Sequence, residues 1–204
     1  MKNKKTKKII IIICASVVGL LLIFASAAGI ISLLGRVDTT DLTGNSNVSL
    51  VPVDYDENIF EDKAYKSKNR NVFFDYDGYA EYITAENYLT FSHSGQLFYN
   101  YFDCVINGNY SYYPSFFSDS FLSSSVLPEK FTMQKLFDIS VTLESRQSYE
   151  DGYLETYSVR YRIMDNNGTF RSDLENDTVI PLIYSVYVTD AYAEITGISV
   201  LGAK

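Results

Sequence analysis

The sequence has little of what metal sites, disulfide frameworks and nucleic-acid-binding surfaces require. Its 204 residues include one histidine, two cysteines and no tryptophan. One histidine and two cysteines are too few for a metal site built of His and Cys ligands, or for a disulfide scaffold. The formal net charge is −8, and an acidic chain lacks the clustered Lys and Arg that bind phosphate backbones. We therefore expect no metal, no cofactor and no nucleic-acid partner.

Recognisable catalytic patterns are also missing. The sequence contains no Gly-rich phosphate loop, no nucleophile elbow and no paired-cysteine motif. His93 and Asp103 are ten positions apart, which places them on different faces of one helix and disfavours an acid–base pair. Residues 75–78 (Asp-Tyr-Asp-Gly) resemble the start of a calcium loop without its later ligands, so we interpret them as a turn. The sequence predicts a non-catalytic protein.

The longest uncharged stretch runs from Ile9 to Leu34 and has 26 residues. At about 1.5 Å per residue, a helix of this length exceeds the roughly 30 Å hydrocarbon core of a bilayer. Only Arg36 follows it closely, whereas five lysines precede it: Lys2, Lys4, Lys5, Lys7 and Lys8. The positive-inside rule then predicts a single-pass protein of the cell membrane. Residues 1–8 form a cytoplasmic leader, residues 9–34 form the transmembrane helix, and the C-terminal part lies outside the cell.

A cleaved signal peptide is the alternative for this stretch. Residues 25–27 (Ala-Ser-Ala) provide a small-residue cleavage site after an apolar run of 16 residues. Cleavage after Ala27 leaves the apolar residues 29–34 at the new N-terminus. The whole run is also longer than the roughly 7–15 apolar residues of a signal peptide. We favour an uncleaved anchor.

The part of the chain beyond the apolar stretch divides by composition. Residues 35–70 are rich in Thr, Asp, Asn and Ser and have no hydrophobic periodicity. Such a composition buries too little apolar surface to offset the entropy of ordering. We interpret residues 35–70 as an extracytoplasmic linker and residues 71–204 as the folded domain.

The folded domain combines a helical half, residues 79–125, with a stranded half after residue 135. Apolar side chains recur at helical spacing within residues 92–106, which predicts the main helix, and a second short helix is predicted over 114–122. Four later segments have the pattern of strands: 137–143, 157–163, 179–189 and 192–201. The predicted fold is α+β, with an N-terminal transmembrane helix followed by two or three helices packed on a curved antiparallel four-stranded sheet.

The chain is rich in tyrosine and phenylalanine, with 18 and 13 residues. Tyr and Phe supply core volume in a chain without Trp, but Tyr is also typical of contact surfaces and ligand pockets, because it combines area with a hydroxyl group. Five tyrosines crowd the junction of the two predicted helices and are candidates for an interface or a pocket: Tyr99, Tyr101, Tyr110, Tyr112 and Tyr113.

The stretch FYNYFDCVINGNYSYYPSFFSDSFL (98–122) resembles the opening of nuclear transport factor 2-like, cystatin-like domains, where a helix ends in an Asn-Gly-Asp/Asn-Tyr turn. The final AEITGISV (193–200) is similar to the family's last strand, with Ala193 at a position usually occupied by Trp. The resemblance covers residues 79–201. It implies a cone-shaped domain in which a curved sheet wraps a helix and can leave a pocket.

A basic cytoplasmic leader, one membrane span, a linker and an external cone also resemble the layout of the bitopic scaffold subunit of type IV secretion and conjugation channels. This likeness implies a non-catalytic assembly or scaffold protein of a bacterial cell membrane. Its partners are then the lipid bilayer, other envelope proteins and further copies of itself. The alternative is a ligand-binding or sensing domain, or a degenerate enzyme, that uses the pocket of the cone.

Overall fold

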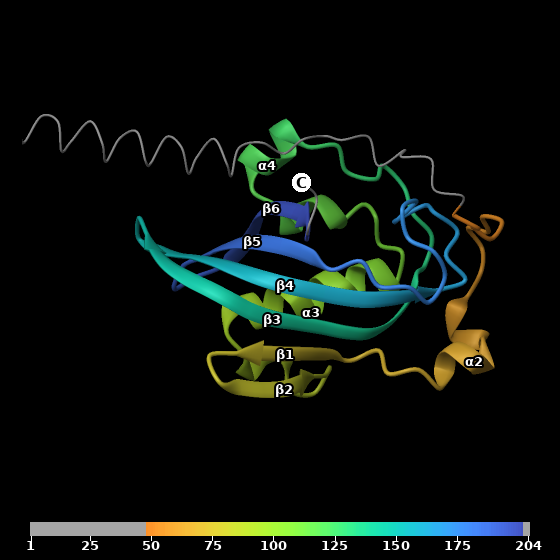
Figure 1. Ribbon diagram of the computed structural model, residues 1–204, viewed down its shortest axis with the longest axis horizontal. Helices are drawn as coiled ribbons and strands as arrows, with labels where there is room; N and C mark the ends of the chain where they lie inside the picture. The colour runs from red at the N-terminus through yellow and green to blue at the C-terminus, as the bar shows by residue number, and fades with distance from the viewer. Residues whose placement is uncertain (1–47, 202–204) are drawn as a thin grey trace, which may run out of the picture. The chain divides into compact units, whose positions relative to one another are not determined.

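The computed structural model describes residues 48–201. They belong to the second of the two units into which the chain divides, Leu42–Lys204, and this unit is built around a six-stranded sheet (Figure 1). The strand order is β2-β1-β3-β4-β5-β6. The strands are β1 (Val72–Tyr76), β2 (Tyr79–Ile83), β3 (Lys135–Tyr149), β4 (Gly152–Met164), β5 (Leu182–Val188) and β6 (Ala193–Val200). Neighbouring strands are antiparallel except β1 and β3, which are parallel, so the sheet is mixed.

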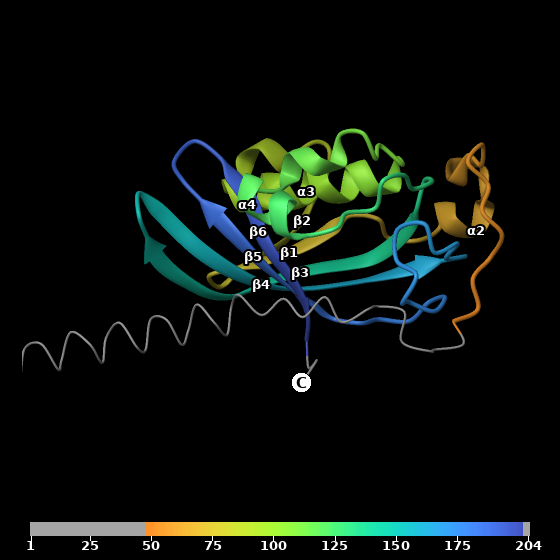
Figure 2. The ribbon, with the colours of Figure 1, turned by 90° about the horizontal axis from the view of Figure 1, so that it is seen from above.

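One face of the sheet is covered by helix α3 (His93–Ile106), and the shorter helix α4 (Asp119–Ser124) lies on the same side (Figure 2). At the start of α3, the hydroxyl of Ser92 accepts a hydrogen bond from the backbone N–H of Gly95 at 3.3 Å. The helix ends at Asn107, and Gly108 then adopts a left-handed φ of +65°. The helix predicted over 92–106 is therefore present at that place.

The second predicted helix, over 114–122, is two separate pieces. They are the 3-10 helix η3 (Tyr113–Phe116) and helix α4 (Asp119–Ser124). Phe117 and Ser118 between them are extended, and the backbone N–H of Ser118 donates to the carbonyl of Ile195 in β6 at 3.0 Å. This hydrogen bond to the sheet is incompatible with a continuous helix.

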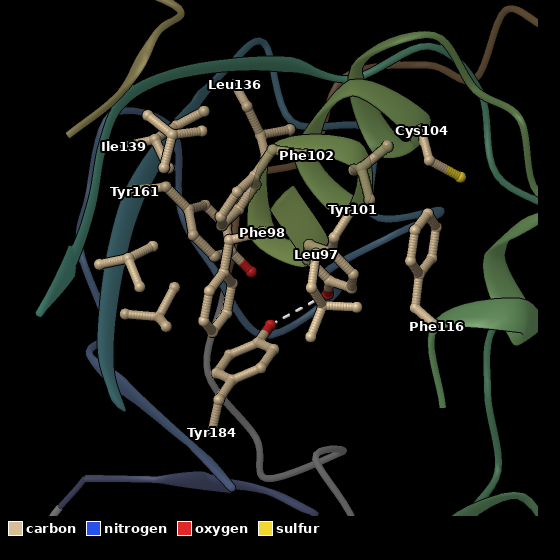
Figure 3. Packing of buried hydrophobic residues seen from close by; sticks show 14 of the residues in the cluster. Leu97, Phe98, Tyr101, Phe102, Cys104, Phe116, Leu136, Ile139, Tyr161 and Tyr184 are labelled. Atoms are coloured by element: carbon tan, nitrogen blue, oxygen red, sulfur yellow. Dashed lines mark hydrogen bonds between the residues drawn. The ribbon is translucent and has the colours of Figure 1, made fainter. Parts of the chain in front are cut away.

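The core lies between α3 and the sheet, where side chains from both fill the layer (Figure 3). Val141 of β3 and Val159 of β4 are register partners, and both are fully buried. The ring of Phe98 on α3 contacts two tyrosine rings edge to face, that of Tyr157 at 4.9 Å and that of Tyr184 at 5.8 Å between centroids. Such pairs add to the stabilisation that comes from apolar burial.

The fold class predicted from the sequence, with its antiparallel four-stranded sheet, is wrong. Residues 72–76 and 79–83 form an additional hairpin, and β1 of this hairpin runs parallel to β3. The sequence interpretation placed the second of these segments in the helical half. Each strand has only five residues and the first four of β2 are exposed, so neither shows enough alternation to be recognised.

The transmembrane helix that the same fold class placed at 9–34 lies outside the described residues, as do the five lysines of the leader. Within residues 48–201, no helix is both long enough and apolar enough to cross a membrane.

Residues 48–70, which fall in the predicted linker, add side chains to the core of the domain. They include the 3-10 helix η1 (Ile59–Glu61) and helix α2 (Lys63–Lys66), and both Ile59 and Tyr65 are buried. The hydroxyl of Tyr65 donates to the carbonyl of Leu136 at 2.9 Å. Two isolated core residues in a polar stretch produce no periodicity, so the composition gave no indication of this packing.

A nearly buried lysine holds this segment against the sheet. The Nζ of Lys135, at the start of β3, lies 2.9 Å from carboxylate oxygens of Glu57, Asp62 and Asp165. Burial opposes the charge of Lys135, but its hydrogen bonds to the three carboxylates outweigh burial and raise the pKa of the amine. The hydrogen bond from Lys135, together with backbone hydrogen bonds from Tyr65 and Ala64, lowers the pKa of Asp62.

Candidate functional site

The interior between α3 and the sheet contains a cluster of three tyrosine hydroxyl groups. The hydroxyl of Tyr101 lies 3.0 Å from that of Tyr113 and 3.0 Å from that of Tyr184. Figure 3 shows Tyr184 pointing from β5 toward Tyr101 on α3, with the hydrogen bond drawn between them. Burial raises the pKa of all three well above the usual value for tyrosine, so they stay protonated. The cluster satisfies its own hydrogen bonds within the core.

The five tyrosines singled out in the sequence therefore do not form one site. Tyr101 and Tyr113 are buried in this cluster. Tyr99 is half-buried and stacks on Tyr88 at 4.7 Å between centroids, whereas Tyr110 and Tyr112 are exposed. Burial explains the first two as core residues. Only Tyr99, Tyr110 and Tyr112 are accessible to a partner or a ligand.

Tyr99 lines a shallow cleft of about 240 Å³ beside the last turns of α3. The cleft lies between α3, the start of β1 and the segment before it. Its lining residues are Phe60, Arg70, Asn71, Val72, Ala85, Tyr99, Phe102, Asp103, Ile106 and Asn107. The guanidinium of Arg70 lies over the ring of Phe60 at 5.4 Å and over that of Tyr65 at 5.6 Å. Two aromatic rings thus hold the Arg70 guanidinium at the cleft, and a hydrogen bond joins the side chains of Asn107 and Asp103.

Asp103, which the sequence analysis considered as a catalytic acid, is one wall of this cleft. The side chain is exposed, but partial desolvation beside the cleft raises the pKa of its carboxyl group, and a hydrogen bond from Asn107 at 2.9 Å opposes the shift. It lies in the last turn of α3, where the helix dipole also disfavours a negative charge. His93 is at the opposite end of the helix, where its Nε2 lies 3.0 Å from the carbonyl oxygen of Asp190. The two residues do not share a site.

A second cleft, of about 300 Å³, adjoins the first, and Asn107 lines both. It contains Tyr110 and the amine of Lys130, which lies over the ring of Tyr55 at 4.1 Å and over that of Tyr110 at 5.8 Å. The other lining residues are Asp56, Gly108, Phe131, Thr132 and Met133. Both clefts are open to solvent, so they suit surface contacts better than the enclosure of a small substrate.

A buried carboxylate in β4 is the polar feature that the sequence analysis missed. Glu155 has no solvent exposure, and its carboxylate accepts hydrogen bonds from the hydroxyls of Tyr157 at 2.6 Å and Tyr76 at 3.0 Å. The Nε of Arg146, on the neighbouring strand, lies 3.3 Å from the same carboxylate. Burial and the charge of Glu155 raise the pKa of Tyr76 to about 12. Three donors therefore occupy the carboxylate.

The pattern of β4 contained an indication of this residue. Glu155 is in phase with Tyr157, Val159 and Tyr161, all on the buried face of the strand. An acid at such a position is buried when it has partners. The partners Tyr76 and Arg146 come from β1 and β3, and their proximity depends on the strand order, which the sequence pattern does not give.

The turn interpreted within residues 75–78 is present at its second half. Asp75 and Tyr76 end β1, and Asp77 and Gly78, with φ of +51° and +84°, form the β1–β2 turn. In the part of the chain that the structure describes, no group of three or more His, Cys, Asp or Glu side chains is placed to hold a metal ion.

Comparison with protein-family models, with curated proteins and with solved structures finds no match for this chain.

Proposed function

We propose that this chain is a membrane-anchored, non-catalytic assembly protein whose folded domain lies on the extracytoplasmic side of a bacterial cell membrane. The anchor is the apolar run 9–34, which lies outside the described residues, and the lysines before it set the orientation. The partners of the protein are the lipid bilayer and other envelope proteins, and the domain holds these envelope proteins together.

The observation that carries the proposal is that the polar groups of the interior are already occupied. An enzyme or a deep binding site keeps reactive groups accessible from a cavity. Here the hydroxyls of Tyr101, Tyr113 and Tyr184 bind one another, and the carboxylate of Glu155 is bound by Tyr76, Tyr157 and Arg146. The features that remain accessible are surface clefts and surface aromatic residues, which suit contact with other proteins.

The resemblance in layout to the bitopic scaffold subunits of conjugation channels gives this proposal its most specific form. In that form the domain is one subunit of a larger envelope complex and is present in several copies. Genes for a secretion ATPase and for channel subunits beside the gene of this chain would support this form. An isolated gene would argue against it.

Two measurements on cells test the proposal. A C-terminal epitope tag and protease treatment of intact cells give the orientation, and we expect loss of the tag with survival of the lysine leader. Chemical crosslinking before detergent extraction tests assembly, and we expect the chain in species larger than a monomer. A domain protected from protease, or a chain that stays monomeric under crosslinking, contradicts the proposal.

Asp103 favours a second candidate function, ligand binding in the cleft lined by Tyr99 and Arg70. Asp103 is exposed, but partial desolvation beside the cleft and its place in the last turn of α3 both disfavour its charge, and carboxylates with a shifted pKa are concentrated at functional sites. Asp103→Asn tests this function. If crosslinking and cellular function survive the substitution, ligand binding through this carboxylate is excluded. Loss of function in a folded Asp103→Asn protein would favour the second candidate.

A further inference from the structure

The two edges of the sheet differ in how they are covered. At one edge, β6 has a bulge opposite β5, and the backbone of Phe117 bridges to Ile195. At the other edge, β2 pairs with β1 in a regular register without a bulge, and its first four residues are exposed. Natural proteins protect sheet edges with bulges, prolines, inward-pointing charges or covering segments. β2 contains no bulge and no proline, and its protection consists of its short length and the charge of Glu81.

The geometry of the hairpin identifies which backbone groups of β2 face outward. Asp77 and Gly78 both have positive φ, as a two-residue type I′ turn requires, so Tyr76 and Tyr79 form a hydrogen-bonded pair. Because hydrogen-bonded and non-hydrogen-bonded pairs alternate, Ala80 and Tyr82 direct their N–H and C=O groups away from β1. The side chain of Asn87 donates to the carbonyl of Tyr82 at 3.0 Å, which agrees with this assignment.

Three backbone groups of the edge remain available for a partner strand. They are the N–H and C=O of Ala80 and the N–H of Tyr82, none of which has a hydrogen-bond partner among residues 48–201. The flanking side chains are large and exposed: Tyr79 is 58% and Tyr82 is 45% exposed. The edge therefore offers backbone hydrogen bonds next to aromatic contact area, which is the combination that strand addition uses.

The hairpin and the chain that follows it carry charge of one sign, and the Arg146 guanidinium of β3, which lies over the ring of Tyr76, is paired with Glu155. Residues 71–129 contain seven acidic residues and no lysine or arginine. Four of the acids are on or beside the hairpin: Asp75, Asp77, Glu81 and Glu86. Within the described part of the chain, none of these four forms an ion pair. A strand that pairs here is therefore attracted if it is basic and repelled if it is acidic.

The same charge disfavours pairing of this edge with a second copy of the chain. Antiparallel pairing of two β2 strands through Ala80 and Tyr82 places the two-fold axis at Glu81. The two Glu81 side chains would then be directly opposite each other, and like charges in that position are destabilising. Glu81 thus selects against self-pairing as well as in favour of a basic partner.

We propose that β2 binds an extended, basic segment of another envelope protein as a seventh strand of the sheet. This inference rests on the proposed assembly function only in taking the partner to be an envelope protein. Backbone hydrogen bonds at Ala80 and Tyr82 provide affinity, Glu81 and its acidic neighbours select the charge, and Tyr79 and Tyr82 contact the side chains of the added strand.

The test uses the full chain in non-ionic detergent and a defined probe. The probe is a fluorescent ten-residue peptide of alternating lysine and valine, and the control peptide has glutamate in place of lysine. We expect binding of the lysine peptide only, with an affinity that falls as salt is raised, because salt screens exposed charges. Hydrogen exchange should show slower exchange of the Ala80 and Tyr82 amides when the peptide is bound.

Two matched variants locate the binding site. Ala80→Pro removes the outward N–H but no hydrogen bond to β1, so we expect it to weaken binding by about tenfold. Ala80→Val keeps the N–H and should bind like the wild type.

Glu81→Lys should weaken binding of the lysine peptide and strengthen binding of the glutamate peptide. Because Ala80→Pro also risks disturbing the hairpin, a lysine peptide N-methylated at alternate residues provides a test on the unaltered protein, and it should bind weakly.

Several results would overturn the inference. They are equal binding of the lysine and glutamate peptides, equal binding to Ala80→Pro and Ala80→Val, or full binding of the N-methylated peptide. Self-association of the chain that is lost in Ala80→Pro would assign the edge to a second copy instead.

If crosslinked complexes in cells persist in Ala80→Pro, the assembly function stands and the inference about β2 fails. If the peptide binds as expected but no complexes form in cells, the edge is confirmed as a binding site and the assembly function fails.

Discussion

The amine of Lys135 and the carboxylate of Asp62 lie 2.9 Å apart, and this contact joins the first residue of β3 to the segment before the sheet. Only 8% of the Lys135 side chain is exposed, whereas its three carboxylate partners are partly in water. The three carboxylates thus share one cation, so removal of Lys135 removes all three contacts, whereas removal of one acid leaves two of them.

The first prediction concerns this lysine. Lys135→Met keeps most of the length of the side chain but leaves Glu57, Asp62 and Asp165 without their shared cation. We expect the amides of residues 57–66 to exchange with solvent about tenfold faster, because the local opening of this segment becomes easier. Hydrogen exchange measures this. Lys66→Met, at an exposed lysine of α2, is the control and should exchange like the wild type. Unchanged exchange in Lys135→Met would show that the buried residues Ile59 and Tyr65 suffice to hold the segment.

The second prediction is the pH dependence of the same contact. The pKa of Asp62 is lowered from 3.8 in the folded protein, so its contribution to stability is complete above 3.8 and is lost as the pH falls through the folded pKa. We expect the protection factors of residues 57–66 in the wild type, which correct for the pH dependence of intrinsic amide exchange, to fall below that pH. In Lys135→Met this fall should be smaller. An equal acid response in the two proteins would exclude the ion pair as its cause.

The third prediction concerns the tyrosine cluster. Tyr101→Phe removes the hydroxyl that joins Tyr113 and Tyr184, and both are then left without this partner in a buried site. We expect the free energy of unfolding in urea to fall by about 1–3 kcal/mol. Tyr112→Phe, at an exposed tyrosine, should change it by less than about 0.5 kcal/mol. Equal stability of the two variants would mean that the cluster contributes no net stabilisation.

The fourth prediction concerns the thiol of Cys104. The side chain is buried in the apolar face of α3, and burial, followed by the charge of Asp103, raises its pKa to about 11. The reactive thiolate is therefore scarce near neutral pH. The other cysteine of the chain, Cys14, is first replaced by serine so that Cys104 is the thiol that reacts. We then expect a thiol reagent to modify Cys104 slowly in the native protein and rapidly in urea. Cys104→Ser should lower stability and leave crosslinked assembly unchanged, and a folded variant that fails to assemble would contradict a packing role.

The fifth prediction separates a structural role of Glu155 from a catalytic one. Glu155→Gln keeps the shape of the side chain but removes the charge that Arg146 and two tyrosines bind. We expect the free energy of unfolding to fall by about 1–3 kcal/mol, toward the low end because Arg146 is partly exposed to water. Crosslinked assembly should persist in the folded fraction. A variant as stable as the wild type that has lost its cellular function would instead point to a chemical role for this carboxylate.

The sequence predicts the elements that have a long and regular pattern. The stripe of Leu97, Tyr101 and Cys104 gives α3, and the alternation around Val141 and Val159 gives β3 and β4, because one buried face over many residues leaves a clear period. The β1–β2 hairpin has strands of five residues, and its Asp77-Gly78 turn was the only local indication of it.

The candidate site was less accessible to prediction, for a physical reason. Tyr101 and Tyr110 are equivalent in composition and lie in one stretch of sequence, yet one is buried in the core and the other is exposed beside Lys130. Which of them faces the sheet depends on where α3 ends and how the chain turns at Gly108. The partners of Glu155 come from three strands, so only the strand order brings them together.

The parallel pairing of β1 with β3 also joins segments that are synthesised at different times. The hairpin of β1 and β2 is local in sequence, but the strand on which β1 docks begins at Lys135, after α3 and α4 have been synthesised. Until then both edges of the hairpin lack a neighbouring strand, and contacts between segments as distant in sequence as β1 and β3 form slowly. A nascent chain that stops before residue 135 therefore carries aggregation-prone strands, and its release or early export should depend on a chaperone.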